Sequence, residues 1–403
     1  MTELRQQSPA AALIELGAGA DVIERFVREA FDQVEPYTVG AEEELLLLDA
    51  DTLELAPVGE RVLAAVGGDA RLVPEFRAAQ LEIVTPVCTS VPDVARELKS
   101  ARRVLSLALE EGVVAIAAGT SPVAFGGGRV TDGARYRWIA EECPWAAQHA
   151  LTCGLHVHVA VPGAERALAV HNALRGYLPE LTALAANAPY FGGFDSQLAT
   201  VRPMLNRAFP RFGVPPALRS LREYAQFVAW GRDSGTVPDP SYHWWDLRLH
   251  PGTGTIELRV ADAQTRVEDA AAVLALVQSL VVWLAERVDA GDRLPVHPSE
   301  KILENAWLAA RDGVEAKLPD YFSGKRTHAG ERLLELEELL APTARARGCD
   351  AELNGLVQLV LAGGGAERQR QLAQHEGVAA LVAYLAKETL EQPPPLVALA
   401  SDR

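Results

Sequence analysis

The segment YTVGAEEELLLLDA, residues 37–50, joins an acidic triplet directly to a run of four leucines. Successive side chains of a β-strand point to opposite faces of a sheet, so Glu42 and Glu44 share one face and Glu43 lies on the other. Two carboxylates about 7 Å apart on one face repel each other unless a cation lies between them. The leucine run favours a buried strand, and a solvated acidic edge is the alternative that this segment alone leaves open.

Other segments repeat this alternation of polar and apolar residues. The polar side chains that share a face in them are Gln80 and Glu82, His156 and His158, Asp246 and Arg248, and Glu257 and Arg259. Taken alone, each pair has an ordinary explanation, such as a partly exposed carboxylate or a surface salt bridge. Taken together, they predict one curved sheet whose concave face is lined by Glu42, Glu44, Glu82, His156, His158, Glu257 and Arg259.

A glutamate-rich set of ligands with a single imidazole suits a hard cation, Mg²⁺ or Mn²⁺. Magnesium commonly completes its coordination with substrate phosphates, which predicts ATP. Neither GxxxxGK[ST] nor a GxGxxG after a strand occurs in the chain. We therefore expect an ATP enzyme that holds its triphosphate through metal ions and arginines. A metal-dependent hydrolase with a His-x-His site and a non-catalytic metal-binding protein are the two alternatives.

Composition narrows the class of protein. The chain has 403 residues, and its 54 acidic and 38 basic side chains give a net charge of −16. Such a surface repels phosphate backbones and anionic lipids, so we expect no nucleic-acid partner and no membrane. The four cysteines form no CxxC pair, and the N-terminus lacks the pattern of a signal peptide, so we expect a reduced, cytoplasmic protein.

The order of the expected elements predicts three regions. Residues 1–36 form an N-terminal helical extension, and residues 37–290 mix strands and helices in a catalytic domain. Residues 291–403 form a helical region packed on that domain, because only helical patterns are recognised beyond Arg266. Residues 187–216 are rich in Pro and Gly and read as a long structured loop, a kind of segment that is usually functional.

The motifs Gly-x-Glu-x-Glu, Gln-x-Glu, Cys-Gly-x-His-Val-His-Val and Glu-Leu-Arg-Val occur in this order between about Tyr37 and Gly313. Together they resemble the glutamate–cysteine ligase type 2 family, also called YbdK-like carboxylate–amine ligases. The resemblance implies an α+β fold of the glutamine synthetase catalytic type. Such a fold has a curved, mainly antiparallel sheet with helices on its outer face, here followed by a C-terminal helical region.

The resemblance also implies roles for individual side chains. Arg259 is expected beside the transferred phosphoryl group, with Glu257 as a catalytic carboxylate and Arg202 meeting a substrate carboxylate or phosphate. His158, Arg248 and Arg259 are expected to bind the nucleotide. The metal ligands that the resemblance implies are Glu42, Glu44, Glu75, Glu82, His156 and Glu257.

The activity that the resemblance implies is ATP-dependent amide formation through an acyl phosphate. The expected cofactors are ATP and Mg²⁺ or Mn²⁺, and the expected partners are a small carboxylic acid, a small amine and further copies of the chain in a homodimer or higher homo-oligomer. Glutamate and cysteine, giving gamma-glutamylcysteine, are the family's usual pair. The sequence departs from the family pattern at Ala188-Pro189-Tyr190-Phe191 and Ser196-Gln197, so another acid and amine are an alternative.

Overall fold

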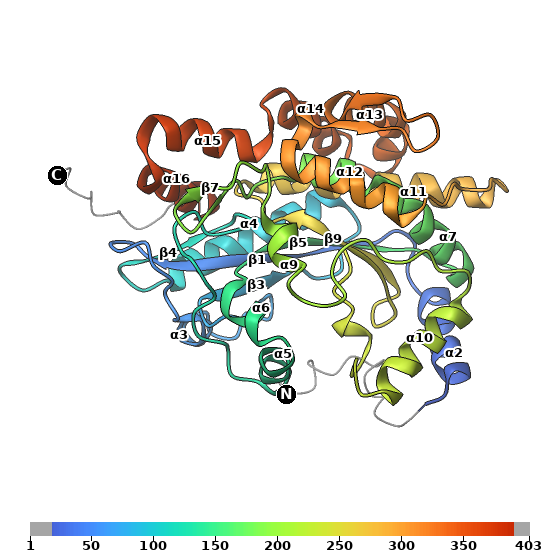
Figure 1. Ribbon diagram of the computed structural model, residues 1–403, viewed down its shortest axis with the longest axis horizontal. Coiled ribbons are helices and arrows are strands. Elements are labelled where there is room, and N and C mark those ends of the chain that lie inside the picture. The colour runs from blue at the N-terminus through green and yellow to red at the C-terminus, as the bar shows by residue number, and fades with distance from the viewer. Residues whose placement is uncertain (1–17, 391–403) are drawn as a thin grey trace.

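A seven-stranded antiparallel sheet runs through the centre of the molecule in the computed structural model, which describes residues 18–390 (Figure 1). Its strand order is β2-β3-β1-β5-β9-β8, and β4 pairs with the end of β1 that β5 leaves free. The strands are β1 (Val39–Asp49), β2 (Leu72–Pro74), β3 (Gln80–Val84), β4 (Val113–Ile116), β5 (Gly154–Ala160), β8 (Leu247–His250) and β9 (Thr255–Asp262). The expected α+β fold with a mainly antiparallel sheet is confirmed.

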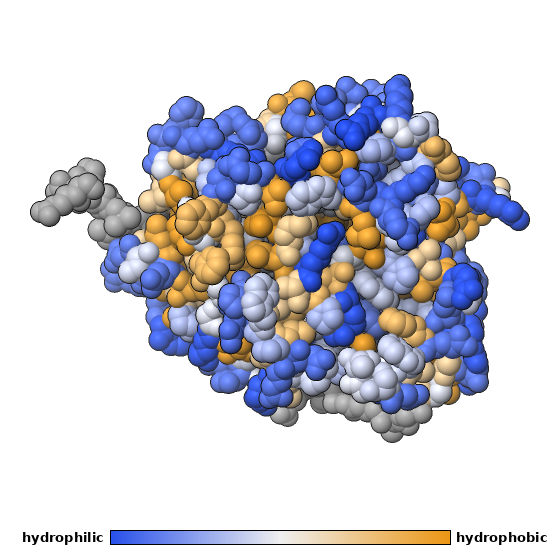
Figure 2. Space-filling model, viewed as in Figure 1, coloured by the Kyte–Doolittle hydropathy of each residue, from blue (hydrophilic) through white to orange (hydrophobic). Residues whose placement is uncertain are grey.

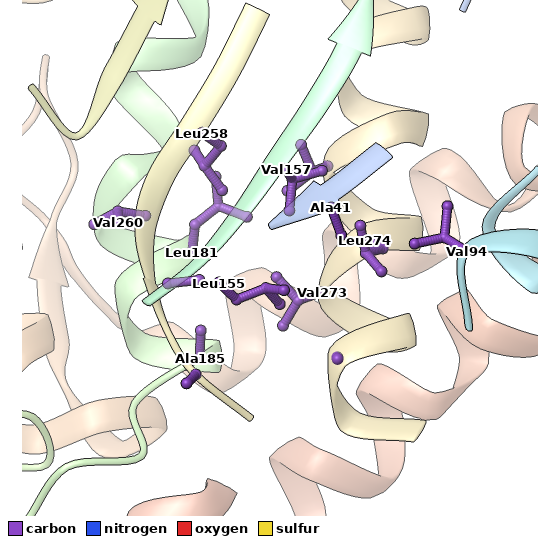
Figure 3. Close-up of a cluster of buried hydrophobic side chains, with 14 of the residues drawn as sticks. Ala41, Val94, Leu155, Val157, Leu181, Ala185, Leu258, Val260, Val273 and Leu274 are labelled. Carbon is purple, nitrogen blue, oxygen red and sulfur yellow. The ribbon is translucent and has the colours of Figure 1, made fainter. Parts of the chain in front are cut away.

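The apolar face of the sheet packs against long helices. Leu155 of β5 lies against Val273 of helix α11, and Leu258 of β9 lies against Leu181 of α8 (Leu178–Leu184) (Figure 3). The residues behind this face also come from α4 (Val91–Ala108) and α8. Helices α5 (Ala134–Glu142) and α6 (Pro144–His149) lie on the opposite side of the sheet from α11 (Figure 1). The polar face is therefore free to line a site.

Helix α11 (Val267–Asp289) is apolar on nearly all sides because it lies between two layers. It packs against α4, α7 and the sheet on one side and against α13 and α14 on the other. By length and composition alone it could cross a membrane, yet 89% of its most apolar stretch is buried inside the protein. The sequence interpretation of this segment as a buried helix therefore agrees with its packing.

The two ends of the described chain share the central core. Helix α2 (Ala20–Asp32) packs on α10 (Leu221–Asp233) and α7 (Ala164–Leu174), and Ile23 and Leu390 belong to one continuous cluster of buried side chains. The remaining helices of four residues or more are α3 (Gly59–Ala65), α9 (Arg202–Asn206), α12 (Ser299–Asp312), α13 (Ala329–Arg347), α14 (Asp350–Leu361), α15 (Gly364–Glu376) and α16 (Val378–Leu390). The predicted regions 1–36, 37–290 and 291–403 stay predictions, and residues 1–17 and 391–403 lie outside the described part.

The expectation of helices alone beyond Arg266 is wrong. A short hairpin of β10 (Lys317–Pro319) and β11 (Arg326–His328) separates α12 from α13. Asp320 builds its turn, because its Oδ1 accepts hydrogen bonds from the backbone N–H groups of Phe322 and Ser323. Strands of three residues are too short to produce a recognisable alternation in sequence.

The expected loop at 187–216 contains regular elements as well. Strands β6 (Tyr190–Phe191) and β7 (Phe194–Asp195) form a hairpin, and α9 follows it. An ion pair from Arg370 on α15 to Asp195 ties this hairpin to the C-terminal helices. Tertiary contacts thus hold this segment in place. Its content of Pro and Gly predicts a loop but not these contacts.

Apolar residues gather on the left half of the face shown in Figure 2, where β7 and α16 lie in Figure 1. Phe125 and Phe194 are 72% and 75% exposed, and the Phe125 ring lies 5.3 Å from that of Phe191. The homo-oligomer expected from sequence stays a prediction. Substitutions at these two phenylalanines offer a direct way to test it.

Candidate active site

The register of the sheet brings the predicted polar residues into one row. Glu44 lies opposite Glu82 across β1 and β3, and Glu42 lies opposite His156 across β1 and β5. His158 pairs with Glu257 across β5 and β9, and Glu257 in turn pairs with Arg248 of β8. The residues therefore span five neighbouring strands, β3, β1, β5, β9 and β8, on one face of the sheet.

A cavity of about 290 Å³ lies over this row. Its floor is the polar sheet face, and its other walls come from the segments around α5, α9 and residues 241–244. The predicted residues that line it are Glu42, Glu44, Glu75, Glu82, His156, Arg202, Arg248 and Arg259. Its volume is at the lower limit for a pocket that holds a small-molecule ligand.

Glu42 lies between the two histidines. Its carboxylate is 3.1 Å from Nδ1 of His156 and 3.3 Å from Nε2 of His158. Burial raises the pKa of Glu42, but the charges and hydrogen bonds of the two imidazoles outweigh burial and hold that pKa well below its usual range. The pKa values of the two histidines nevertheless shift in opposite directions. Burial lowers the pKa of His156 to about 4, whereas Glu257 and Glu42 overcome burial and raise the pKa of His158.

Glu257 is fully buried and is held by two arginines. Oε1 of Glu257 is 3.0 Å from Nη2 of Arg248 and also accepts from Arg259. Burial raises the pKa of Glu257, but Arg248 and Arg259 outweigh it and hold this pKa well below its usual range. Nη1 of Arg259 lies 3.3 Å from Nδ1 of His156 as well. A guanidinium is thus fixed directly beside the row of predicted metal ligands.

Among residues 18–390, the carboxylates at the β3 end of the row form no ion pair with an arginine or a lysine. Burial raises the pKa of Glu44 to about 7, and the nearby charge of Glu75 adds to the shift. Burial and the charges of Glu42, Glu75 and Glu44 raise the pKa of Glu82 well above its usual range. Burial raises the pKa of Glu75 too. Clustered carboxylates of this kind need a proton or a cation between them.

The donors fit a hard divalent cation. The described residues contain three groups of side chains whose ligand atoms, within each group, lie no more than 4.8 Å apart. The groups are Glu42 with His158 and Glu257, Glu42 with Glu82 and His156, and Glu44 with Glu75 and Glu82. The Nε2 atoms of His156 and His158 are buried and form no hydrogen bond of good geometry among residues 18–390, but carboxylate oxygens of Glu44 and Glu42 lie 3.7 and 3.3 Å from them. Carboxylate oxygens with a neutral imidazole match Mg²⁺ or Mn²⁺. The predicted ligand assignments stay predictions, and the structure adds His158 to the atoms within reach.

Arg202 lies at the cavity, but most of its guanidinium is engaged by the protein. Its Nη1 and Nη2 donate to the backbone carbonyls of Arg259 and Val260 on β9. Gly154 makes room for it, because a Cβ at this position would lie 2.2 Å from Nη2 of Arg202. The predicted contact of Arg202 with a substrate carboxylate stays a prediction, and its visible role is to hold β9.

Several residues that line the polar cavity were not predicted from the sequence. Arg135 and Tyr136 come from α5, Asn206 ends α9, and Ser241 precedes β8. Nη1 of Arg135 donates to Oγ of Ser241 at 2.7 Å, which links two walls of the cavity. These residues carry no strand alternation, so no local signal distinguishes them from surface residues. Asp246, which shares a face with Arg248 in the sequence pattern, instead lines a small separate cavity with Arg207.

A second cavity of about 290 Å³ lies beside the row, next to the residues that precede Glu42 on β1. It is lined mainly by apolar and backbone groups and reaches Glu42 and His158. Val39, Val84, Pro86 and Val87 contribute its apolar side. The row of carboxylates and imidazoles therefore separates a mainly apolar cavity from a polar one.

Comparison with known proteins shows the family of the chain. Residues 38–388 match the model of "Glutamate-cysteine ligase family 2(GCS2)". The chain belongs to glutamate–cysteine ligase family 2. The resemblance noted in the sequence is confirmed, and membership of this family makes the protein an ATP-dependent ligase. The hydrolase and non-catalytic alternatives are thereby set aside.

Named relatives of this family are similar over nearly the whole chain. A Rubrobacter xylanophilus protein, provisionally named glutamate–cysteine ligase 2-3, is 42% identical over 361 residues, 88% of this chain and 97% of its own. A second protein of that organism, provisionally named glutamate–cysteine ligase 2-1, is 38% identical over 345 residues, 85% of this chain and 91% of its own.

Solved structures share the fold at low sequence identity. The Francisella tularensis glutamate–cysteine ligase, solved in complex with AMP, matches with a TM-score of 0.67 at 12% identity and covers 91% of each chain. A bifunctional glutathione synthetase from Pasteurella multocida matches with a TM-score of 0.59 at 17% identity, covering 92% of this chain and 53% of its own. At these identities the likeness supports the fold alone.

We expect the two histidines to differ in their effect on metal dependence. His156→Ala removes an imidazole whose Nε2 lies 3.7 Å from Glu44 and should raise the Mg²⁺ concentration needed for half-maximal activity about tenfold. His158→Ala should mainly raise the KM for ATP, because His158 borders the apolar cavity. Titrations of Mg²⁺ and ATP on both variants measure this. An equal loss of metal affinity would identify His158 as a metal ligand too.

Proposed function

We propose that the protein joins a carboxylic acid to an amine through an acyl-phosphate intermediate. The proposed acid is glutamate. Cysteine is the first amine to test, because the family is named after it. A carboxylate is a poor electrophile, and transfer of the γ-phosphoryl group of ATP makes it reactive. The acid's oxygen attacks the γ-phosphorus and ADP leaves. The amine then attacks the acyl carbon, and phosphate leaves. The observation that supports this proposal is the row of carboxylates and imidazoles with the guanidinium of Arg259 beside it.

The residues that would hold divalent ions are the three groups of donors described above. Mg²⁺ bound there would neutralise phosphate charge and bridge phosphate oxygens to the protein. The described side chains do the remaining positioning. Glu257 fixes Arg259 and Arg248 in the row, so both guanidiniums are oriented before any substrate binds. Arg259 is then placed to stabilise charge that develops on the transferred phosphoryl group.

We place the nucleotide base in the apolar cavity and the acid and amine in the polar one. The apolar cavity offers Val39, Val84 and Pro86 as a surface for an adenine ring. From there a triphosphate would pass Glu42 and His158 and reach Arg259 in the polar cavity. The acid and the amine would meet the γ-phosphate from the opposite side, which suits an in-line displacement.

No cysteine is needed as a nucleophile in this scheme. All four cysteines are buried, and burial raises the pKa of the Cys153 thiol, the one nearest the row, well above its usual range. A thiol with a raised pKa is a weak nucleophile. The reaction is therefore expected to proceed by direct transfer rather than through a covalent enzyme intermediate.

Release of phosphate from ATP tests the proposal. We expect phosphate release with Mg²⁺ to require both an acid and an amine, and an amide to form in equal amount. Glutamate with cysteine is the first pair, followed by glutamate with a panel of other amines. Hydroxylamine in place of the amine should trap the acyl phosphate as a hydroxamate. Phosphate release that needs no acid would contradict an acyl-phosphate route.

A further inference from the structure

One wall of the polar cavity is built from aromatic rings. The five rings that line it are those of Phe76, Tyr136, Phe209, Phe212 and Trp244. They come from four separate parts of the chain, which are the segment between β2 and β3, helix α5, the residues after α9 and the segment before β8. This wall is named the aromatic wall below.

The rings of the aromatic wall form a continuous chain of contacts. Phe76 lies 6.0 Å from Tyr136 and 6.3 Å from Phe209, measured between ring centroids. Trp244 lies 5.9 Å from both Phe209 and Phe212, and it stacks on Phe212 at an angle of 21°. Rings at these distances and tilts stabilise each other. The wall is therefore a fixed surface and not a set of separate side chains.

The wall adds the surface of its rings to the cavity. The hydroxyl of Tyr136 donates to the backbone carbonyl of Pro74 at 2.9 Å, so its polar end is already satisfied. Ile139 adds a further apolar side chain beside it. Phe76, Phe209 and Phe212 are only half-buried in the protein. Apolar surface left facing a cavity favours a ligand with apolar surface of its own.

The wall begins beside the carboxylates at the β3 end of the row. Glu75 directly precedes Phe76 in the chain, and Glu75, Glu82 and Tyr136 line the same cavity. Carboxyl oxygens of Glu44, Glu75 and Glu82 lie within 4.8 Å of one another at this end. These oxygens accept hydrogen bonds, which an amine or ammonium nitrogen can donate and a substrate carboxylate cannot. We therefore assign this end of the cavity to the amine.

We propose that the amine substrate carries an aromatic ring or an apolar group of similar size, which packs on the aromatic wall while its nitrogen lies near the row. This inference rests on the proposed ligase function and specifies its amine. The side chain of cysteine has one methylene and a thiol, too little surface to cover five rings. Burying a phenyl ring that alanine lacks should improve kcat/KM at least about tenfold.

A panel of amines tests the inference with the full-length protein, ATP, Mg²⁺ and glutamate. The probes are L-alanine, L-cysteine, L-phenylalanine and 2-phenylethylamine. We expect kcat/KM for at least one of the two aromatic amines to exceed that for alanine and for cysteine by at least about tenfold. A preference for cysteine or alanine would overturn the inference and leave the ligase function intact.

Variants of the wall locate the preference. Phe212→Ala should reduce the advantage of the aromatic amine about tenfold and leave the KM for ATP within about twofold, and Phe212→Leu should restore part of it. Trp230→Ala is the matched control, because Trp230 is 58% exposed on α10 and does not line the cavity. An aromatic preference that survives Phe212→Ala and Phe209→Ala unchanged would contradict a role for the wall.

Binding separates a failure of this inference from a failure of the ligase proposal. Calorimetric titration of 2-phenylethylamine into the protein with Mg²⁺ and a non-hydrolysable ATP analogue needs no turnover. Binding that Phe212→Ala weakens about tenfold supports the wall, even if no pair of substrates yields an amide. No binding of 2-phenylethylamine where cysteine does bind would overturn the inference.

Discussion

Replacing Glu257 with glutamine is expected to lower the rate of amide formation at least about 100-fold. Glu257 is fully buried and accepts hydrogen bonds from both Arg248 and Arg259. The substitution keeps the shape of the side chain and removes the negative charge that orients both guanidiniums. It also removes one of the carboxylates within ligand distance of Glu42 and His158. Steady-state kinetics with ATP, Mg²⁺ and both substrates measures the effect.

Substitution of a carboxylate in the row should reduce activity far more than substitution of an exposed carboxylate elsewhere on the surface. Glu44→Gln is expected to cause a comparable loss, because Glu44 belongs to another of the donor groups. Glu111→Gln serves as the control, since Glu111 is exposed and lies outside both cavities. Near-normal turnover in both Glu257→Gln and Glu44→Gln would show that the row does not carry the chemistry.

The second large effect is expected on stability, and it concerns a buried ion pair on the apolar side of the sheet. Glu43 points away from the row and forms a fully buried ion pair with Arg102 of α4, with contacts of 2.6 and 2.9 Å. Arg102 also donates to the backbone carbonyls of Gln264 and Thr265, just after β9. One guanidinium thus joins β1 to the chain that follows β9, although β5 lies between these two strands.

Arg102→Met should lower the free energy of unfolding by about 3–5 kcal/mol, because it leaves the charge of Glu43 buried without a partner. The decrease in the urea midpoint measures this. Arg102→Met combined with Glu43→Leu should recover a large part of the loss, since no unpaired charge is left. Arg61→Ala is the control, because the ion pair of Arg61 with Glu110 is largely exposed. A urea midpoint for Arg102→Met equal to that of Arg61→Ala would contradict a stabilising role for the buried pair of Glu43 and Arg102.

The strand pattern predicted much of the candidate site. Glu42 and Glu44 do share a face with His156, His158 and Glu257, as the alternation implied. Arg202 shows where the pattern stops being sufficient. Its position at the cavity agrees with the expectation, but its bonds to the carbonyls of β9 depend on a chain segment 57 residues away.

The aromatic wall and the hairpin at residues 317–328 were not predictable in the same way. Phe76, Tyr136 and Trp244 lie far apart in sequence, and each reads locally as an ordinary core or surface ring. The hairpin has strands of three residues, which are shorter than the roughly four to eight residues over which alternation can be recognised. The spacing of residues that are neighbours in sequence therefore predicts neither the aromatic wall nor the hairpin.

The sequence by itself determined which side chains of a strand share a face, because the period of two is set by the covalent backbone and needs no partner. It therefore separated Glu43 from Glu42 and Glu44. The tertiary structure decided which strands are neighbours, and hence that Glu42 meets His156 while Glu43 meets Arg102. These pairings depend on long-range register and on the helices that pack against the apolar face, and the free energy that selects them comes from burial of the whole core.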